Sequence, residues 1–326
     1  MSSISLDTFN ETISLEDFET PVSSLDLHEP LLLDTATGPV TIKDAIETMR
    51  SVGVGHLVVT ENKVLKGILT ERDILHKLFG VVKNYQDCAI VDYMTANPFT
   101  ITPESSLLEC MKTMGVRGFR HLPLVNESHH PIGVLSIKDI LTHLIKFFPE
   151  TFNGIGGLET WEVNDLNLRD ELLSLNNPTA SSKVIGHDLF ITLLKDVITT
   201  NALKADYQSS IFDIAKKLRE NRQGSLGLME YESKLRGMIT ERDFLKKIFL
   251  NEEAENGTLN ISHFMTPNPD TLLERHLVGQ GLNNMFKKNY RNLVIVDEDQ
   301  IPVSIITLVD ILRFIYESIT KELENT

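Results

Sequence analysis

The sequence predicts an α/β (α+β) fold made of four tandem β-α-β-β-α units that pair into two modules, and two repeats support this prediction. Residues 66–79 (KGILTERDILHKLF) return nearly unchanged 170 residues later as 236–249 (RGMITERDFLKKIF). A weaker copy follows each strong one, PIGVLSIKDIL at 131–141 and PVSIITLVDIL at 302–312. Because the copies stay in register over such a distance, they indicate a duplicated structural unit in the order A-B-A′-B′.

Each unit is expected to open with a short extended run and a helix. In units two and four the run follows a Met-Thr pair and prolines, in YMTANPFTITP at 93–103 and FMTPNPDTLL at 264–273. Apolar residues at helical spacing then predict a helix in units two and three: Leu107, Leu108, Met111 and Met114, and Ile211, Ile214, Ala215 and Leu218. Ser105 or Ser106 can cap the first of these helices.

Two strands and a second helix complete each unit. The first strand is an apolar run in every unit: Leu57–Val59, Leu122–Val125, Leu226–Leu228 and Leu293–Val296. After a turn, a second strand ends in Thr or Ser, and an Asp three residues later opens an amphipathic helix. A unit of about 55–60 residues with short strands cannot bury a core alone, so the units are expected to pair.

The repeat boundaries divide the chain into units and connecting segments. We predict an acidic N-terminal arm (1–29), units at 30–80, 88–148, 187–250 and 258–318, a linker (149–186) and a tail (319–326). The first 42 residues contain no Lys or Arg, which is typical of a solvated arm, or alternatively of a segment that docks on a module or a client protein. The linker is expected to contain a helix near Leu166–Leu175, and its Gly154–Gly157 run lacks dinucleotide-fingerprint spacing.

These motifs resemble the CBS-domain family, with four CBS units arranged as two tandem pairs, or Bateman modules. The resemblance covers roughly residues 30–147 and 186–318. It rests on Met94-Thr95-x-x-Pro98, His121-Leu-Pro-Leu-Val125, and Gly67-x-x-Thr70-Glu-Arg-Asp73 with its three counterparts. One Thr-x-x-Asp element would be weak, but four in register between an apolar strand and an amphipathic helix are specific.

The Thr/Ser-x-x-Asp element brings a hydroxyl, a carboxylate and a helix start to one point, which suits a ribose and its phosphate. The candidate binding residues by unit are Thr70, Arg72, Asp73 and His56; Ser136, Lys138, Asp139, Arg117, Arg120 and His121; Thr240, Arg242 and Asp243; and Thr307, Asp310 and Arg291. Unit two is richest in cations. Unit four departs most, because Ser304 replaces the glycine of the other units and its turn carries no charge.

By resemblance to the family, the Thr or Ser and the Asp bind ribose, and basic groups of the partner unit bind phosphates. Thr100, Ile101 and the strand at Leu122-Pro123 are expected to enclose adenine. The alternative is that each Asp only caps its helix. A cation at a helix start, such as Arg72 or Arg242, argues against pure capping, although Glu71 and Glu241 could neutralise it.

Composition and motifs exclude several classes of function. A net charge of −15 disfavours a nucleic-acid surface, and no apolar run is long enough to cross a membrane. The acidic N-terminus lacks a positive n-region, and the two cysteines show no metal-ligand spacing. We therefore expect a cytoplasmic protein without a metal site. Because no nucleophile elbow, His-Glu-x-x-His or Walker sequence is present, we expect neither enzyme activity nor a catalytic cofactor.

Two functions remain after these exclusions. The first is a sensor that binds AMP, ADP, ATP or a related adenosyl ligand between paired units and signals by changed module packing to a client protein in trans. The second is an interaction scaffold with vestigial sites. A homodimer is expected, but the sequence leaves open whether the modules pack within one chain or between two.

Overall fold

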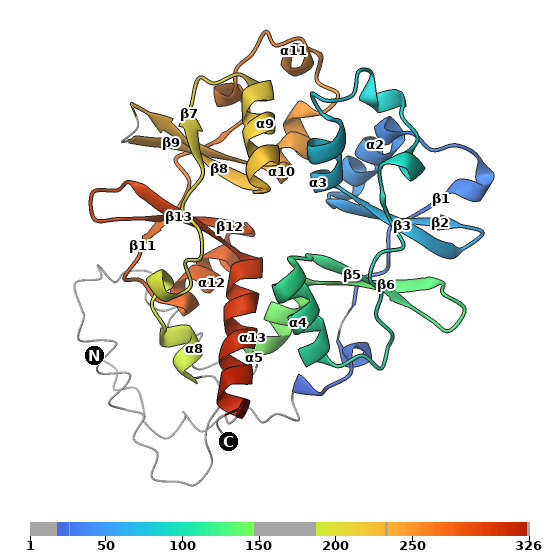
Figure 1. Ribbon diagram of the computed structural model, residues 1–326, viewed down its shortest axis with the longest axis horizontal. Helices are drawn as coiled ribbons and strands as arrows, with labels where there is room; N and C mark the ends of the chain where they lie inside the picture. Colours follow the sequence, from blue (N-terminus) through green and yellow to red (C-terminus); the bar gives the residue numbers. More distant parts are fainter. Residues whose placement is uncertain (1–17, 26, 147–186, 232–233, 325–326) are drawn as a thin grey trace.

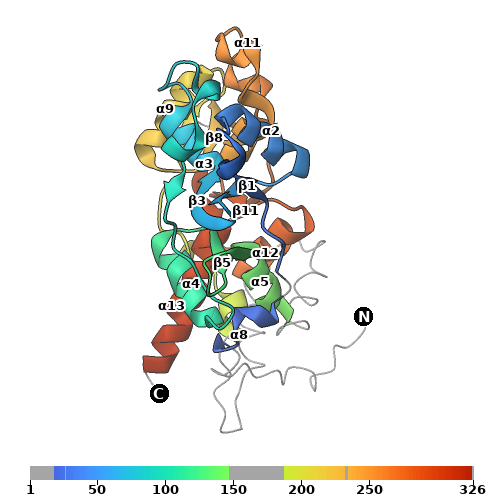
Figure 2. The same cartoon turned by 90° about the vertical axis from the view of Figure 1, so that its right-hand side faces the viewer.

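Four units surround a common centre. The computed structural model describes residues 18–25, 27–146, 187–231 and 234–324. Units one and three lie side by side in Figure 1, as do units two and four, and each unit also contacts the other member of its own pair. Figure 2, turned by 90°, shows that the assembly is thin, so the chain has the shape of a disc.

Units one and two form the first module. The sheet β1-β2-β3-β4 consists of Leu32–Asp34, His56–Glu61, Val64–Thr70 and Thr95–Ala96, the last of which leads into unit two. The helices of unit one are α2 (Ile42–Val52), α3 (Glu71–Asp73) and the π-helix η4 (Ile74–Leu78). Unit two contains α4 (Leu107–Arg117), β5 (His121–Val125), β6 (Pro131–Ser136) and α5 (Ile137–Lys146).

Units three and four repeat this arrangement after α8 (His187–Ile191). The sheet of unit three runs β10-β9-β8-β7, with Thr266–Pro267, Lys234–Thr240, Ser225–Glu230 and Lys204–Asp206. Its helices are α9 (Ile211–Asn221), α10 (Glu241–Asp243), the π-helix η9 (Phe244–Ile248) and α11 (Glu252–Glu255). Unit four contains β11 (Thr271–Leu273), α12 (Val278–Lys287), β12 (Asn292–Val296), β13 (Pro302–Thr307) and α13 (Leu308–Glu324).

The helices and strands predicted from the apolar pattern are confirmed. Ser106 caps α4, because its hydroxyl accepts from the Glu109 amide at 3.2 Å. The closing helices differ between units: those of units one and three end within one π-turn, whereas α5 and α13 continue as regular helices. None of the helices among the described residues is both long and apolar enough to cross a bilayer.

The two large cores cross from one module to the other. One core contains apolar residues of units one and three, including Ile46, Phe79 and Phe244. The other joins units two and four, where Gly115 of α4 lies against α13 so closely that a Cβ there would come within 3.1 Å of the Arg313 backbone. Only small clusters join the sheets within a module, such as Val58 and Leu65 with Val125 and Val134. The modules therefore pack against each other within one chain.

Reciprocal arginines reinforce the contact between units one and three. Arg50 of α2 donates to the Leu245 carbonyl at 2.7 Å, and also to that of Phe249. Arg219 of α9 donates to the carbonyls of His76 at 3.1 Å and Phe79 at 2.7 Å. Each guanidinium thus satisfies carbonyls at the end of the other unit's closing helix, which would otherwise lack partners.

Two of the predictions on the connecting segments can be compared with the described residues, and a third cannot. The interpretation of residues 1–29 as a solvated arm is wrong for Phe18 and Val22, which are 2% and 0% exposed; the Val22 amide donates to the Ser105 carbonyl of unit two. The tail predicted from residue 319 starts inside α13, because Ile319 is buried in the core. The linker helix predicted near 166–175 lies outside the described residues.

Replacing Arg50 by Met should loosen the contact between the modules. The carbonyls of Leu245 and Phe249 lose their donor, so amide hydrogen exchange should rise in residues 244–249 without global unfolding. Lys43→Met on the exposed side of the same helix is the matched control, because the ion pair of Lys43 is with Glu47 at the surface. Equal exchange in the two variants would show that Arg50 does not hold the modules together.

Candidate functional site

All four Thr/Ser-x-x-Asp elements fold into the same hydrogen-bonded loop. In unit one, Asp73 Oδ2 accepts from the Thr70 amide at 2.9 Å and from its hydroxyl at 2.6 Å, and Thr70 Oγ1 accepts from the Asp73 amide at 3.2 Å. The same three contacts form in the other units, in the pairs Ser136–Asp139, Thr240–Asp243 and Thr307–Asp310. The motif is therefore a capping box in every unit, as the alternative to a ligand site predicted.

The second carboxylate oxygen distinguishes the units. Lys77 lies 2.7 Å from Asp73 Oδ1, and Lys247 lies 2.8 Å from Asp243 Oδ1. In unit two the corresponding oxygen of Asp139 faces His28 at 3.8 Å, and in unit four Arg313 lies 3.5 Å from Asp310. A ligand hydroxyl at these oxygens would share them with a Lys, Arg or His side chain.

The first large cavity lies between units one and two and has a volume of about 290 Å³. Thr70 and Asp73 border it on one side, and Phe99 and Arg117 border it on the other. The Arg117 guanidinium lies over the Phe99 ring, 5.5 Å from its centroid. The cavity thus combines a hydroxyl–carboxylate pair, an apolar wall and a cation.

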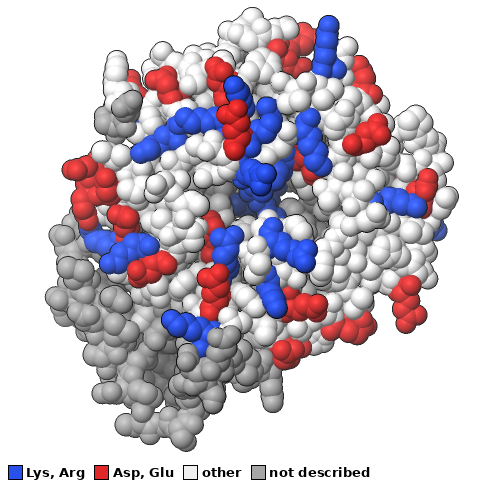
Figure 3. Space-filling view, viewed as in Figure 1, with Lys and Arg blue, Asp and Glu red and all other residues white. Residues whose placement is uncertain are grey.

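The second large cavity lies between units three and four and has a volume of about 450 Å³. Thr240 and Asp243 border it at the positions of Thr70 and Asp73. Asp270 replaces Phe99 in its wall, and Arg291, Arg242, Lys246 and Tyr290 also line it. Arg120 and Glu71 border both cavities, so the two sites meet at the centre of the disc. Figure 3 shows Lys and Arg gathered around the hollow there.

The Ser136 and Thr307 elements border a much smaller gap of about 30 Å³. Lys138, which lines this gap, donates to Asn289 of the other module at 2.9 Å. The His28 carbonyl accepts from the Val134 amide, so the N-terminal segment lies along the strand that leads to Ser136. A gap of this size holds roughly one or two water molecules rather than a nucleoside.

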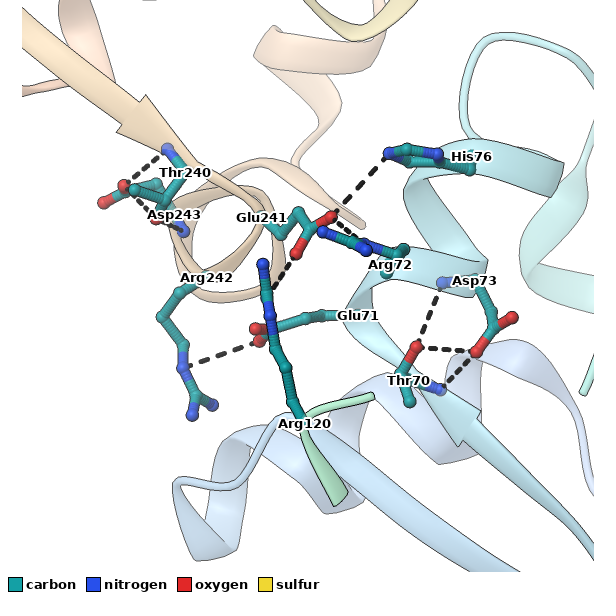
Figure 4. Close-up of polar contacts among 10 residues, drawn as sticks. All are labelled: Thr70, Glu71, Arg72, Asp73, His76, Arg120, Thr240, Glu241, Arg242 and Asp243. Atoms are coloured by element: carbon teal, nitrogen blue, oxygen red, sulfur yellow. Dashed lines mark hydrogen bonds and ion pairs between the residues drawn. The ribbon is translucent and has the colours of Figure 1, made fainter. Parts of the chain in front are cut away.

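Two buried glutamates each form an ion pair with an arginine of the other module (Figure 4). Glu241 of unit three is 1% exposed and accepts from Arg72 of unit one at 2.6 Å and from Arg120 of unit two at 2.6 Å. The symmetric pair is looser, because Arg242 Nε lies 3.5 Å from Glu71 Oε2. Glu71 and Glu241 do neutralise the arginines at the helix starts, but each does so for the arginine of the other module.

The two carboxylates differ in pKa although they occupy equivalent positions. Burial would raise the pKa of Glu241, but Arg120 and Arg72 outweigh burial and hold the pKa at about 2. Burial raises the pKa of Glu71, and Arg242 only partly offsets that effect. The centre of the disc is therefore electrostatically asymmetric.

In units one and three, a glycine directly before β2 or β8 leaves room for the buried glutamate. A Cβ on Gly55 would lie 2.4 Å from Glu71 Oε2, and one on Gly224 would lie 2.7 Å from Arg120 and 2.9 Å from Glu241. The amide of each glutamate also donates to the carbonyl of the neighbouring glycine. The close approach thus requires residues without a side chain at both positions.

His56 and His121 stack at the same centre, with ring centroids 4.0 Å apart. Burial lowers the pKa of His56 to about 4, with further contributions from Arg291 and Arg242. Burial also holds the pKa of His121 well below its usual value, and His56 adds to this effect. His121 lines both the cavity between units one and two and the small gap, whereas His56 adjoins the site through the stacked ring and through its strand pairing with Thr70.

Some of the predicted site residues do not border the large cavities. Ile101 is 3% exposed in the core that joins units two and four, and its amide donates to the Pro123 carbonyl. Pro98 and Phe99, rather than Thr100 and Ile101, line the unit one cavity. Phe99, Lys77 and Lys246 were not among the predicted site residues. The alignment of the two halves places them near the motif, but an alignment does not show which side chains line a cavity.

Comparison with known proteins agrees with this architecture. The family model described as CBS domain matches residues 33–80, 90–146, 194–250 and 261–317. CBSCBSPB1 from Arabidopsis thaliana is 26% identical over 318 residues, which cover 94% of this chain and 56% of that protein; CBSCBSPB5 is 24% identical over 313 residues, or 93% and 54%. This chain thus spans only about half the length of these relatives. The crystal structure of MJ1225 from Methanocaldococcus jannaschii superposes with a TM-score of 0.68 at 18% identity, covering 90% of this chain and 99% of that one.

The chain belongs to the CBS domain family. Its four CBS units pair as two Bateman modules, as the repeats predicted, and these modules form one disc.

The two buried glutamates should respond oppositely to neutralisation. Glu241→Gln should destabilise the fold by roughly 3–5 kcal/mol at pH 7, because Arg72 and Arg120 lose their anion. Glu71→Gln should leave the free energy of unfolding unchanged or raise it, because burial already disfavours its charge. Urea unfolding of both variants at pH 7 measures this difference. Equal destabilisation would contradict the asymmetry.

Stability should fall as the pH drops from 6.5 to 4. Because the pKa of folded His56 is about 4, below the ordinary value of 6.5, the unfolded chain binds the proton first over this range. One such group contributes at most about 3 kcal/mol. Urea unfolding of His56→Phe should show a flatter pH dependence, while His129→Asn in an exposed turn should match the parent chain. Parallel profiles for all three proteins would exclude His56 as the source.

Proposed function

We propose that this chain binds adenine nucleotides or related adenosyl ligands in the clefts between paired CBS units and acts as a non-enzymatic regulatory protein. The observation that carries the proposal is the pair of cavities, about 290 and 450 Å³, that each bring a Thr–Asp pair and arginines together. These volumes suit small-molecule ligands. A carboxylate oxygen accepts hydrogen bonds from ribose hydroxyls, and guanidinium groups donate to phosphate oxygens.

The proposed signal is a change in module packing. Arg120 and Glu71 border both cavities, and Glu241 links Arg120 to Arg72 across the modules. A ligand that moves one of these groups therefore changes the contact between modules. Such a ligand shifts the packing only by the difference in its affinity for the two arrangements.

AMP, ADP or ATP is the ligand we expect, and the signal would pass to a client protein in trans. We also expect a homodimer and a cytoplasmic location, with neither nucleic acid nor a membrane as partner. Because the helices of both modules already pack within one chain, a homodimer would use a different surface of the disc.

An interaction scaffold is the second candidate function. The observation in its favour is that each of the four motif carboxylates already accepts from its own Thr or Ser, with a Lys, Arg or His side chain near its other oxygen. These groups are satisfied without a ligand. A scaffold would need only the capping contribution, typically about 1 kcal/mol per helix.

Ligand-dependent thermal shifts distinguish the two functions. Millimolar AMP, ADP, ATP and S-adenosylmethionine should raise the melting temperature of nucleotide-free protein by mass action. Asp73→Ala with Asp243→Ala should abolish the shift while the protein stays folded, as measured by circular dichroism. Glu104→Ala, in an exposed loop, is the control for losing a carboxylate. Absence of any shift in the parent chain would favour the scaffold.

A further inference from the structure

The proposed function gives two clefts, and they differ in the cations left free to meet a ligand. Resting on that function, we propose that the cleft of units three and four binds adenosine di- or triphosphate, whereas the cleft of units one and two binds adenosyl ligands with at most one phosphate. Glu241 is the residue that creates the difference. It belongs to unit three but forms ion pairs with Arg72 and Arg120, which line the cleft of units one and two.

In the cleft of units one and two, the arginines at the centre are already committed. Arg72 and Arg120 each lie 2.6 Å from a Glu241 oxygen. To hold a phosphate, either would have to leave a fully buried carboxylate, which costs several kcal/mol for an uncompensated charge. Arg117 remains, and it stacks on Phe99 beside the cavity. One cation suits one phosphate or a positively charged or neutral adenosyl group.

The residues one helical turn after Arg72 and Arg242 add to the difference in charge between the two clefts. In unit one this residue is His76, which lies 3.7 Å from Glu241, and burial lowers its pKa despite that carboxylate. In unit three the equivalent residue is Lys246, which lines the larger cavity and makes no ion pair within the described part of the chain. The equivalent position therefore carries an imidazole with a lowered pKa in unit one and a permanent cation at the cavity in unit three.

Besides Arg120, which Glu241 already binds, three cations line the cleft of units three and four. Arg242 pairs loosely with Glu71, its Nε lying 3.5 Å from Oε2, whereas Lys246 and Arg291 have no ion-pair partner among the described residues. Burial and the neighbouring Arg242 lower the pKa of Arg291, so an anion placed between them would relieve that repulsion. Three cations around one cavity suit the clustered charges of a di- or triphosphate.

Of the four carboxylates that line this cavity, Glu71 is the loose partner of Arg242, and the other three are paired with cations outside this set. Lys247 lies 2.8 Å from Asp243, and Lys288 lies 2.9 Å from Asp270. Glu241 is neutralised by two arginines. The cavity is also the larger of the two, at about 450 Å³ against 290 Å³, which leaves room for additional phosphates.

Isothermal titration of single-cleft variants tests the assignment. The full chain would carry Asp73→Ala, which leaves the cleft of units three and four, or Asp243→Ala, which leaves that of units one and two. Each variant is titrated with adenosine, AMP, ADP and ATP. We expect Asp73→Ala to bind ATP at least tenfold more tightly than AMP, and Asp243→Ala to bind AMP at least as tightly as ATP. The same ligand order in both variants, or the reverse order, would overturn the assignment.

The contribution of the cations to phosphate binding can be tested with variants that leave the Thr–Asp motif intact. Lys246→Met and Arg291→Met should each weaken ATP binding about tenfold or more and leave adenosine binding unchanged. Lys83→Met, an exposed residue outside the cavities, controls for the loss of one charge. If the parent chain binds none of the four ligands, the proposed function itself fails. If it binds them but these variants bind ATP like the control, only the ligand assignment fails.

Discussion

The burial of Glu241 between Arg72 and Arg120 is the constraint on which much of this structure depends. The three residues come from units three, one and two, so the ion cluster forms only when both modules are docked. A carboxylate 1% exposed is tolerated because two guanidinium groups lie within hydrogen-bond distance. Among the described residues, the equivalent Glu71 has one ion-pair partner, Arg242, whose Nε lies 3.5 Å from Oε2. The duplicated sequence therefore gives a centre that is symmetric in its backbone and asymmetric in its charge.

Hydrophobic burial explains why the modules share one body. Each unit is small, and its helices pack both on the strands of their own unit and on the facing unit of the other module. The core of units one and three and the core of units two and four consequently cross the module boundary, while small clusters join the sheets inside each module. Separating the modules would expose both large cores, so the disc depends on the pairing across modules as much as on the pairing within them.

The Thr–Asp motif has two physical roles that are compatible. As a capping box it satisfies the amides at the start of the closing helix, and Lys77 or Lys247 holds the other carboxylate oxygen. These same contacts fix the carboxylate at the edge of a cavity. A group that is already oriented loses little entropy when it binds a ligand. Structural satisfaction of the motif is therefore compatible both with ligand binding and with a scaffold, and for this reason the sequence pattern alone could not decide between the two roles.

Local spacing and the repeat alone predict the four units, their element order, a cap at Ser105 or Ser106 and the position of each Thr/Ser–Asp pair. They also offer Glu71 and Glu241 as partners for Arg72 and Arg242. The contacts formed on folding select Ser106 as the cap, take each glutamate from the other module, pack Phe18 on unit two, and bury Ile101 while Phe99 lines a cavity. Periodicity reports which side of an element is apolar, but contacts between residues 170 positions apart depend on how whole modules dock.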